Sequence, residues 1–406
     1  MMTVIKKIKT DRVLIITTLL LCLYGLVAIY SATWTGTPGA WKSYFLRQVI
    51  WIMIGLVIMV FTAKIPLDWV HMSAGGLYFI NLCFLVVLLF LPDTGQPSRW
   101  INIGSFQLQP SEFMKPVMVI TLAALLGSQN CSLKKIRYLL AAFALVLVPF
   151  ILVMKQPDLG TSLTFLVILI PMLYWKGLSL FIIMIIFFPV VTFVAAFNFW
   201  TFSFIMLIIC AILILSRQRA VVFWAVFLVN ILAGIAAPNL WHHLHDYQKQ
   251  RVLGFLGLVS DPQGSGYQII QSKVAIGSGG IIGKGFLHGS QTQLRFLPAQ
   301  HTDFIFSVLA EEWGLLGALV VLVTFLIFLL RIITVAYNAK TDFAGLMTFG
   351  FMVIFLFQVV VNIGMTMGIM PVTGMPLPFI SYGGSSLLTN MVMIGLIVNT
   401  AMQRYK

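Results

Sequence analysis

The stretch GALVVLVTFLIFLL, residues 317–330, contains no charged residue and lies in an apolar segment at 303–330. A helix needs about 20 mainly apolar residues to cross about 30 Å of hydrocarbon. Similar segments recur along the chain, about twelve in all, and some reach that length only marginally. We therefore predict an all-α integral membrane protein, a polytopic bundle of about twelve transmembrane helices. The segments fall at 13–31, 46–63, 77–92, 112–127, 138–154, 159–175, 178–197, 201–216, 220–240, 303–330, 343–369 and 384–402.

The composition excludes a water-soluble domain. Hydrophobic residues make up 60% of the chain and charged residues only 9%, whereas a soluble domain is about 25% charged. The net charge of +14 would suggest nucleic acid binding in a soluble protein. Here much of the charge lies in short loops, where it favours membrane topology and anionic lipid, so we expect membrane lipids and no nucleic acid as partners.

Loop charges predict the orientation. Basic residues gather in the loops at 134–137, 217–219 and 331–340 and in the C-terminal tail. By the positive-inside rule these loops and both termini are cytoplasmic, so the segment 241–302 is extracytoplasmic. The basic N-terminus precedes an apolar run without a small-residue cleavage site, so we expect a retained first helix.

The segment 241–302 is the long polar stretch of the chain. It is rich in Gly and Gln but keeps Ile, Leu and Phe, which disordered linkers lack. We expect short helices that lie at the interface or fold back on the spans. No internal repeat is apparent, so the sequence gives no support to an inverted-repeat transporter.

Asp261, in the sequence Ser-Asp-Pro-Gln-Gly at 260–264, is a candidate catalytic carboxylate. Asp before Pro is a typical helix N-cap. The same side chain could act as a general base at the membrane surface. The two roles are compatible, because a capping turn can fix a catalytic group.

A second candidate is the pair Glu112 and Lys115, which share one face of a helix that Pro110 and Ser111 are expected to begin. One interpretation is a cap followed by a lysine that snorkels to the surface. The alternative is a functional ion pair, because a charge within a span needs a partner or a wet cavity.

Four further positions have both a structural and a functional interpretation. Asp158 and Asp303 can each cap the helix that follows, and His301 immediately precedes Asp303 in the order His-Thr-Asp. Arg47, at the outer end of the second segment, can snorkel or bind an anion. Glu311 and Glu312 lie about two turns inside a span and require partners.

Several motif matches fail. The glycine-rich run at 277–285 is neither a Walker A motif nor a dinucleotide fingerprint, although its backbone amides could hold an anion. His242, His243 and His245 lack a fourth ligand in a metal-binding pattern, so we assign no metal ligands.

Long motifs connect the chain to a known family. They are QPSEFMKP (109–116), QPDLGTS (156–162), HDYQKQRV (245–252), SDPQGSGYQIIQSKVAIGSGG (260–280), GKGFLHGSQTQ (283–293), FLPAQHTDFIFSVLAEEWGLLG (296–317) and GMPLPFISYGGSS (374–386). In order and over nearly the whole chain they resemble the SEDS family, which is named for shape, elongation, division and sporulation. The sequences of these motifs are more similar to those of the elongation branch of the family than to those of the division branch.

The resemblance implies a function and its residues. It implies a peptidoglycan glycosyltransferase that polymerises lipid II for cell elongation and rod shape. Its partners would be a class B penicillin-binding protein (a transpeptidase) and other elongation-complex proteins, in the bacterial inner membrane with the active loop periplasmic. Asp261 matches the essential carboxylate of the family. We assign substrate binding to Arg47, Glu112, Lys115, Asp158, Gln271, Lys273, His301 and Asp303.

One departure concerns the number of helices. Residues 1–406 read as a single membrane domain, but members of this family typically have ten spans. The excess falls in the segment 178–240, which we predict to be an inserted pair of transmembrane helices.

The residues suggest a mechanism, stated as a hypothesis. Asp261 would accept the proton of the attacking sugar hydroxyl, while Lys115 and Arg47 would stabilise the departing pyrophosphate. A divalent cation, Mg²⁺ or Mn²⁺, is a candidate cofactor there, and Glu112 would orient Lys115 or bind that cation. The lipid tail would lie in a groove between spans. Two alternatives remain. One is a lipid II flippase or transporter, and the other is a scaffold without enzymatic activity.

Overall fold

The computed structural model describes residues 11–34, 40–90, 99–103, 106–129, 131–133, 135–156, 158–216, 220–243, 249 and 265–403. Each apolar segment predicted above coincides with one helix, and a short antiparallel hairpin of two strands precedes α4. The elements are α1 (Arg12–Thr33), α2 (Ala40–Thr62), α3 (Leu67–Phe90), β1 (Ile101–Ile103), β2 (Phe106–Leu108), α4 (Pro110–Leu126), α5 (Ile136–Lys155), α6 (Leu159–Trp175), α7 (Leu180–Ala195), α8 (Phe199–Leu215), α9 (Ala220–His243), α11 (Ser265–Gly279), α12 (Ser290–Gln293), α13 (Ile305–Tyr337), α14 (Asp342–Thr366) and α15 (Gly384–Gln403).

The helices confirm an all-α polytopic membrane protein. Among the described residues, eight helices are long and apolar enough to cross a membrane. Helices α6, α7 and α8 are apolar but shorter, and at 17 residues α8 is about 26 Å long. Helix α4 carries two charged side chains near its start. The count of about twelve spans therefore remains a prediction.

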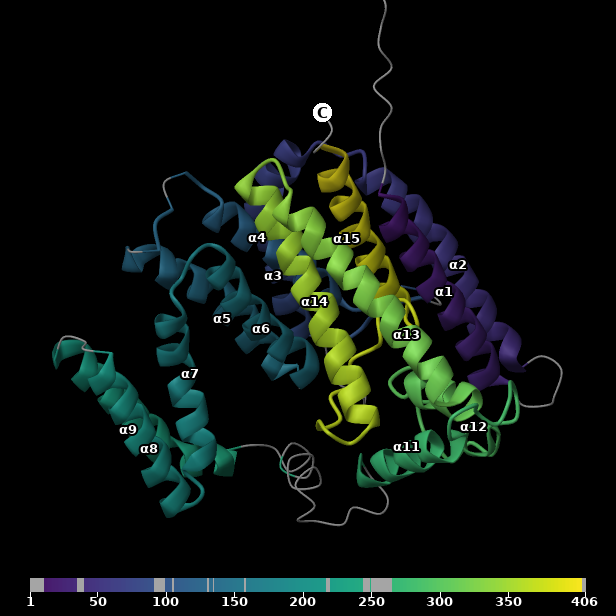
Figure 1. Cartoon of the computed structure of the whole chain (residues 1–406). Coiled ribbons are helices and arrows are strands. Elements are labelled where there is room, and N and C mark those ends of the chain that lie inside the picture. Colours follow the sequence, from purple (N-terminus) through teal and green to yellow (C-terminus); the bar gives the residue numbers. More distant parts are fainter. Residues whose placement is uncertain are drawn as a thin grey trace, which may run out of the picture. The chain divides into compact units, whose positions relative to one another are not determined.

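The chain divides into two compact units, 1–172 with 262–406 and 173–261. In the first unit, α14 and α15 are the most deeply buried spans. Helix α15 packs against α2 and α4, and α14 packs against α13 and α4 (Figure 1). Helices α15 and α2 approach closely at Gly395, where an added Cβ would lie 1.8 Å from Oγ1 of Thr62. Small residues permit such close packing of spans.

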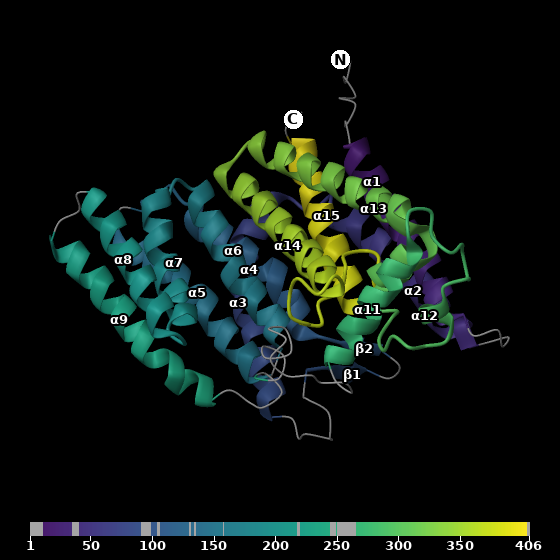
Figure 2. The same ribbon diagram turned by 60° about the horizontal axis from the view of Figure 1, so that its bottom comes forward.

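Helices α1 and α13 run antiparallel, and polar contacts join them at both ends. At one end Nε of Arg331 donates to Oδ2 of Asp11 at 2.7 Å. At the other end the hydroxyl of Ser31 donates to Glu312. We call this second end, where α1 and α14 finish and α2, α4, α13 and α15 begin, the site end of the unit. Helices α11 and α12 and the hairpin β1–β2 lie at the site end (Figure 2).

Helix α13 is interrupted at Gly314, whose φ of 65° is outside the helical region. The freed backbone groups bond to the extended segment that follows α11. Leu315 N donates to Gly280 O at 2.9 Å, and Gly285 N donates to Glu312 O at 2.9 Å. Backbone groups at such breaks in a membrane protein must find new partners. The break therefore fixes α11 and its loop onto the start of α13.

The second unit contains α7, α8 and α9. Its core consists of Phe188, Ile209, Leu213 and Val226. Oγ1 of Thr192 donates to Oδ1 of Asn230 at 2.7 Å and links α7 to α9 inside this core. The predicted insertion at 178–240 falls within this unit, and its status as an insertion remains a prediction.

Candidate active site

Helix α4 begins at Pro110, as predicted. Proline fits the first helical position because its missing N–H would have no partner there. The residue before it, Gln109, donates its backbone N–H to Oγ of Ser385 at 3.2 Å. Oγ of Ser385 in turn donates to the carbonyl of Gln107 in β2 at 3.1 Å. The start of α15 therefore fixes the start of α4.

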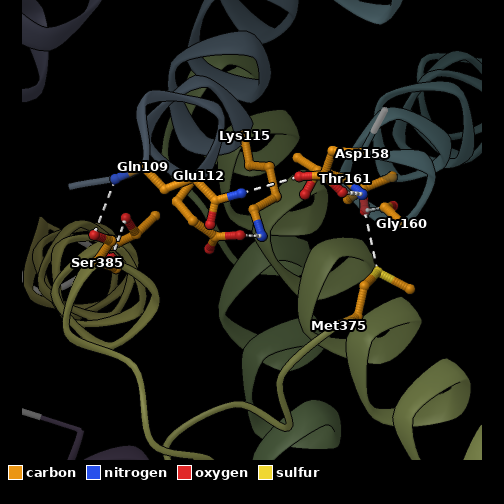
Figure 3. Close-up of polar contacts among 10 residues, drawn as sticks. Gln109, Glu112, Lys115, Asp158, Gly160, Thr161, Met375 and Ser385 are labelled. Atoms are coloured by element: carbon orange, nitrogen blue, oxygen red, sulfur yellow. Dashed lines mark hydrogen bonds and ion pairs between the residues drawn. The ribbon is translucent and has the colours of Figure 1, made fainter. Parts of the chain in front are cut away.

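The first turns of α4 carry a buried ion pair. Nζ of Lys115 donates to Oε1 of Glu112 at 2.6 Å (Figure 3). Lys115 is 1% exposed and Glu112 is 4% exposed. The interpretation of Lys115 as a snorkelling lysine is therefore wrong, because its ammonium group lies inside the protein beside a carboxylate. A buried ion pair adds little to stability, since desolvation offsets the attraction.

The second carboxylate oxygen of Glu112 is also buried. Oε2 has no hydrogen-bond partner among the described residues. Leaving such an atom unsatisfied costs about 1–3 kcal/mol or more for a charged group. Glu112 and Lys115 thus retain unused hydrogen-bonding capacity for a substrate, which the hypothesis of a functional pair requires.

Asp158 joins α6 to α4. Its Oδ1 accepts from the backbone N–H of Thr161 at 3.2 Å, which confirms the predicted N-cap. Its Oδ2 accepts from Nε2 of Gln109 at 3.0 Å (Figure 3). The sequence predicted Asp158 in a motif separate from the Glu112–Lys115 pair. Gln109 links the two, because its backbone carbonyl accepts from the N–H of Glu112 at 3.1 Å while its side chain donates to Asp158.

A chain of contacts extends this cluster toward α13. Met375 packs against Gly160 and accepts from Oγ1 of Thr164 at 3.6 Å. Asn362 donates to the carbonyls of Met375 at 2.7 Å and Asp303 at 2.9 Å. Asp303 therefore lies at the same site end as Asp158.

His301 belongs to an aromatic cluster at the site end. Its ring centroid lies 4.7 Å from that of Tyr44 and 5.9 Å from that of Tyr382. Burial lowers the pKa of His301, so the neutral imidazole is favoured. Arg47, one turn after Tyr44 on α2, is exposed and joins none of these contacts.

Gln271 and Lys273 lie on α11, on either side of Ser272. Ser272 is buried and its Oγ donates to the carbonyl of Thr366 at 2.6 Å, which anchors α11 to α14. Lys273 is exposed and lies against Gly368, where its Nζ is 2.6 Å from the place of an added Cβ. The structure thus places both residues at the site end, but it does not join them to Glu112 and Lys115.

Glu311 and Glu312 have the partners that burial demands. Glu311 accepts from Nζ of Lys284 at 2.8 Å and from Oγ1 of Thr292 at 2.8 Å. Glu312 accepts from Ser31. These carboxylates hold the loop after α11, so we assign them a structural role.

An apolar groove runs beside α4. It has a volume of about 1020 Å³ and is lined by α3, α4 and α15, with Trp69, Ser73, Leu77, Phe113, Val117 and Ile120 among its walls. Glu112 and Lys115 face about 140° away from Phe113, Val117 and Ile120 on the same helix, at about 100° per residue. One helix therefore presents a charged pair on one face and a groove wall on a nearly opposite face.

Two predictions cannot be located. Asp261 and most of the segment 244–264 lie outside the described residues. The second is the site of the divalent cation. In the part of the chain that is described, no group of three His, Cys, Asp or Glu side chains could hold a metal ion. The described side chains alone do not form a metal site, so we derive no step from a metal.

Sequence reasoning missed Gln109, Ser272 and Ser385, which hold the site together. All three stand inside the motifs quoted above, and that position was their only signal in the sequence.

Comparisons with known proteins identify the family of this chain. The family model described as "Cell cycle protein", for FtsW, RodA and SpoVE, matches residues 11–204 and 182–406. Peptidoglycan glycosyltransferase MrdB of Escherichia coli (strain K12) is 38% identical over 397 residues, 97% of this chain and 94% of the relative. Peptidoglycan glycosyltransferase RodA of Treponema pallidum (strain Nichols) is 34% identical, with 96% of each chain covered.

Solved structures share the fold. A chain from a study of "polymerization and crosslinking by a peptidoglycan synthase complex" has a TM-score of 0.72 and 28% identity, with 98% of this chain and 99% of that chain covered. The Thermus thermophilus rod shape determining protein RodA has a TM-score of 0.63 at 24% identity, with 98% of each chain covered.

The fold and the cluster define a polytopic integral membrane protein with a buried charged site at one end of its helical bundle. The chain belongs to the SEDS family, the family of FtsW, RodA and SpoVE. Relatives named FtsW are 32–33% identical, so the preference for the elongation branch rests on a small margin.

Proposed function

We propose that this peptidoglycan glycosyltransferase polymerises lipid II into glycan strands at the extracytoplasmic face of the bacterial inner membrane. The glycosyltransferase class follows from the family and from relatives that bear this name over nearly their whole length. The substrate, the sidedness and the residue roles are the proposal. Loop charge supports the sidedness, because the end opposite the site carries Arg331 and Lys340.

The observation that carries the proposal is that α4 carries both the buried Glu112–Lys115 pair and one wall of the apolar groove. Lipid II combines a polyprenyl chain with a pyrophosphate and a disaccharide. The groove suits the polyprenyl chain, which needs an apolar surface open to the bilayer. Lys115 offers a cation that is already desolvated, and its attraction for a pyrophosphate is stronger there than in water.

The reaction would need one base and one cation. A sugar hydroxyl attacks the anomeric carbon, the bond from that carbon to the pyrophosphate oxygen breaks, and the electron pair leaves with the polyprenyl pyrophosphate. Asp261 would take the proton of the hydroxyl. Ordinary glycosides also require an acid at the leaving group. Pyrophosphate leaves without protonation, so Lys115 and Arg47 would serve by stabilising its charge.

Glu112 would set the position of Lys115. A flexible lysine side chain loses rotamer freedom when it is held, and the 2.6 Å contact fixes it before substrate binds. The free Oε2 of Glu112 is one carboxylate oxygen for Mg²⁺ or Mn²⁺. A cation would need further ligands from the substrate or from residues outside the described part, so its involvement remains a proposal.

A class B penicillin-binding protein is the proposed partner, together with other proteins of the elongation complex. The support is the structural likeness to a chain of a peptidoglycan synthase complex that coordinates polymerization and crosslinking. A transpeptidase partner would crosslink the strands that this chain releases.

Reconstitution in liposomes separates this proposal from its alternatives. The complete chain would be incorporated with its partner, whose transpeptidase is blocked by a β-lactam, and supplied with fluorescent lipid II. We expect glycan strands, and none from the partner alone. Movement of lipid II between leaflets without glycan would instead identify a flippase, and neither reaction despite partner binding would identify a scaffold.

The distribution of buried charge disfavours a flippase. A path across the membrane needs polar groups along its length. Within the described first unit, the ion pairs with a buried carboxylate lie at its two ends. Asp11–Arg331 lies at one end, and Glu112–Lys115 and Glu311–Lys284 lie at the site end.

A further inference from the structure

A further pocket lies at the end of the first unit opposite the site end, where α1 and α3 begin and α2 and α15 finish (Figure 1). Its volume is about 480 Å³, within the range of ligand pockets. Its walls come from the first turn of α1, the end of α2 with the turn that follows, and the last two turns of α15. Among its described lining residues, only Ile65 also lines the apolar groove. The reaction proposed above does not use this pocket.

The part of the pocket that lies within the spans is apolar. Its walls there are Ile15, Met59, Val60, Val398 and Met402. The side chain of Val60 is exposed on the outer surface of α2, so the pocket is open to the hydrocarbon around the bundle. Methionine side chains are flexible and adapt to irregular apolar shapes. This part of the pocket therefore suits an acyl chain that enters from the bilayer.

The rim of the pocket carries positive charge. Lys64, in the turn between α2 and α3, lines the pocket and is exposed. Arg12 is also exposed, and it lies three residues before Ile15, on the same side of α1 as that wall residue. Neither cation forms an ion pair with another described residue. Asp11, which precedes Arg12, is already paired with Arg331. Two accessible cations therefore remain for a ligand.

The surroundings of the pocket do not cancel this charge. Two helices finish there and two begin there, so the negative and positive ends of their dipoles offset one another. Asp68 is the acidic residue nearest to Lys64 in the sequence, on the first turn of α3. Its side chain is exposed, does not line the pocket and forms no ion pair with Lys64. The side chains of the described residues thus leave the rim positive.

Hydrogen bonds hold the walls of the pocket together. Nδ2 of Asn399 donates to the carbonyl of Ile65, in the turn that carries Lys64. Oδ1 of Asn399 accepts from Nε2 of Gln403 at 3.3 Å. These bonds join the end of α15 to the turn after α2, so the pocket exists before a ligand binds. A preformed pocket lowers the entropy that binding costs.

We propose that this pocket binds an anionic phospholipid of the surrounding membrane. The phosphodiester would lie between Lys64 and Arg12, and one acyl chain would lie against Met59, Val60 and Val398. Basic pockets between transmembrane helices bind anionic headgroups in this way. The bound lipid would connect α1, α2 and α15 at the end opposite the site. This inference does not depend on the proposed function, because it concerns lipid binding at a different place.

Titration with lipid tests the inference apart from catalysis. The complete chain would be freed of bound lipid in a neutral detergent and titrated with phosphatidylglycerol or with phosphatidylcholine of the same acyl chains. The melting temperature and the lipid retained in native mass spectra report binding. We expect phosphatidylglycerol to raise the melting temperature to a plateau, and phosphatidylcholine to have little effect at the same concentrations. Lys64→Gln should weaken phosphatidylglycerol about fivefold, the contribution of one cation near an anionic headgroup.

Matched variants separate the pocket from the general charge of this end. Lys340→Gln removes an exposed cation at the same end that does not line the pocket, so it should bind phosphatidylglycerol like the wild type. Val60→Trp would fill the apolar part without changing charge and should also weaken phosphatidylglycerol. Its control is Val57→Trp, one turn earlier on α2, because Val57 is exposed and does not line the pocket. Affinity for lipid II should be the same in Lys64→Gln and the wild type.

Three results would overturn the inference. Equal weakening by Lys340→Gln and Lys64→Gln would show that the lipid responds only to the diffuse positive charge of this end. Unchanged binding of phosphatidylglycerol by both Lys64→Gln and Val60→Trp would show that the pocket holds no lipid. A loss of lipid II affinity in Lys64→Gln, with phosphatidylglycerol bound as in the wild type, would assign the pocket to the substrate instead.

Discussion

Nζ of Lys115 lies 2.6 Å from Oε1 of Glu112, and both side chains are buried near the start of α4. We expect Lys115→Met to lower the rate of lipid II polymerisation about 10²–10³-fold, the usual cost of removing one group that stabilises a transition-state charge. The double variant Glu112→Gln/Lys115→Met removes both charges, so it should fold but stay inactive.

The matched control for this pair is Arg331→Gln. Arg331 also pairs with a buried carboxylate, Asp11, but at the opposite end of the unit. Thermal unfolding and polymerisation would be measured for each variant. If Arg331→Gln lost as much activity as Lys115→Met at equal stability, the special role of Lys115 would be refuted.

Asp158 is predicted to position the site. Both of its carboxylate oxygens are occupied, by Thr161 N and by Gln109 Nε2. Asparagine caps helices as well as aspartate does, and the amide of Gln109 can turn to offer its oxygen, so Asp158→Asn should keep most of the activity. Asp158→Ala should lose about 1 kcal/mol of stability and about tenfold or more in rate.

The same polymerisation and unfolding assays check this prediction. An asparagine variant as inactive as the alanine variant, but fully stable, would show that the negative charge itself is needed. Asp158 would then contact substrate or a cation, as the sequence-based assignment holds.

The groove is predicted to bind the polyprenyl chain. Ser73→Trp would place an indole in the groove, so the KM for lipid II with a full-length polyprenyl chain should rise about tenfold, with a smaller effect for a short-chain analogue. Ile80→Trp is the control, because Ile80 is exposed on α3 and does not line the groove. Equal effects of both variants on both substrates would count against this assignment.

His301 should make stability depend on pH. Burial lowers its pKa in the folded state below the usual value of about 6.5, so the unfolded chain binds the proton more readily. The stability contribution of neutral His301 is complete above about pH 6.5 and is lost as pH falls through the folded pKa. In His301→Gln, the melting temperature should therefore fall less between pH 7 and pH 5. An identical fall in both proteins would contradict the prediction.

The helices were predictable because apolar length alone determines a span. The boundaries of the helices were less predictable. Helix α3 begins at Leu67, although the predicted apolar segment begins at residue 77. Its first turns carry Asp68, Ser73 and two glycines, which lowers their apolar content. The short helices of the polar loop were predicted and are α11 and α12. The hairpin β1–β2 was not, because strands of three residues leave no periodic signal.

The contacts of the site that join residues close together in the sequence were predictable. Spacing placed Glu112 and Lys115 on one face, and the pair is formed. Their burial was not evident, because it depends on α14, α15 and other helices that pack around α4. The contact of Gln109 with Ser385, 276 residues away in the sequence, follows from tertiary packing that no local pattern records.

The most direct test compares lipid II polymerisation by the wild-type chain and by Asp261→Asn, each purified with the partner whose transpeptidase is blocked. Asp342→Asn, at the start of α14 and far from the site end, is the matched control. We predict long glycan strands from the wild type and from Asp342→Asn, and none from Asp261→Asn that still binds lipid II. Wild-type rates from Asp261→Asn would contradict the account, because the reaction would then proceed without its proposed base.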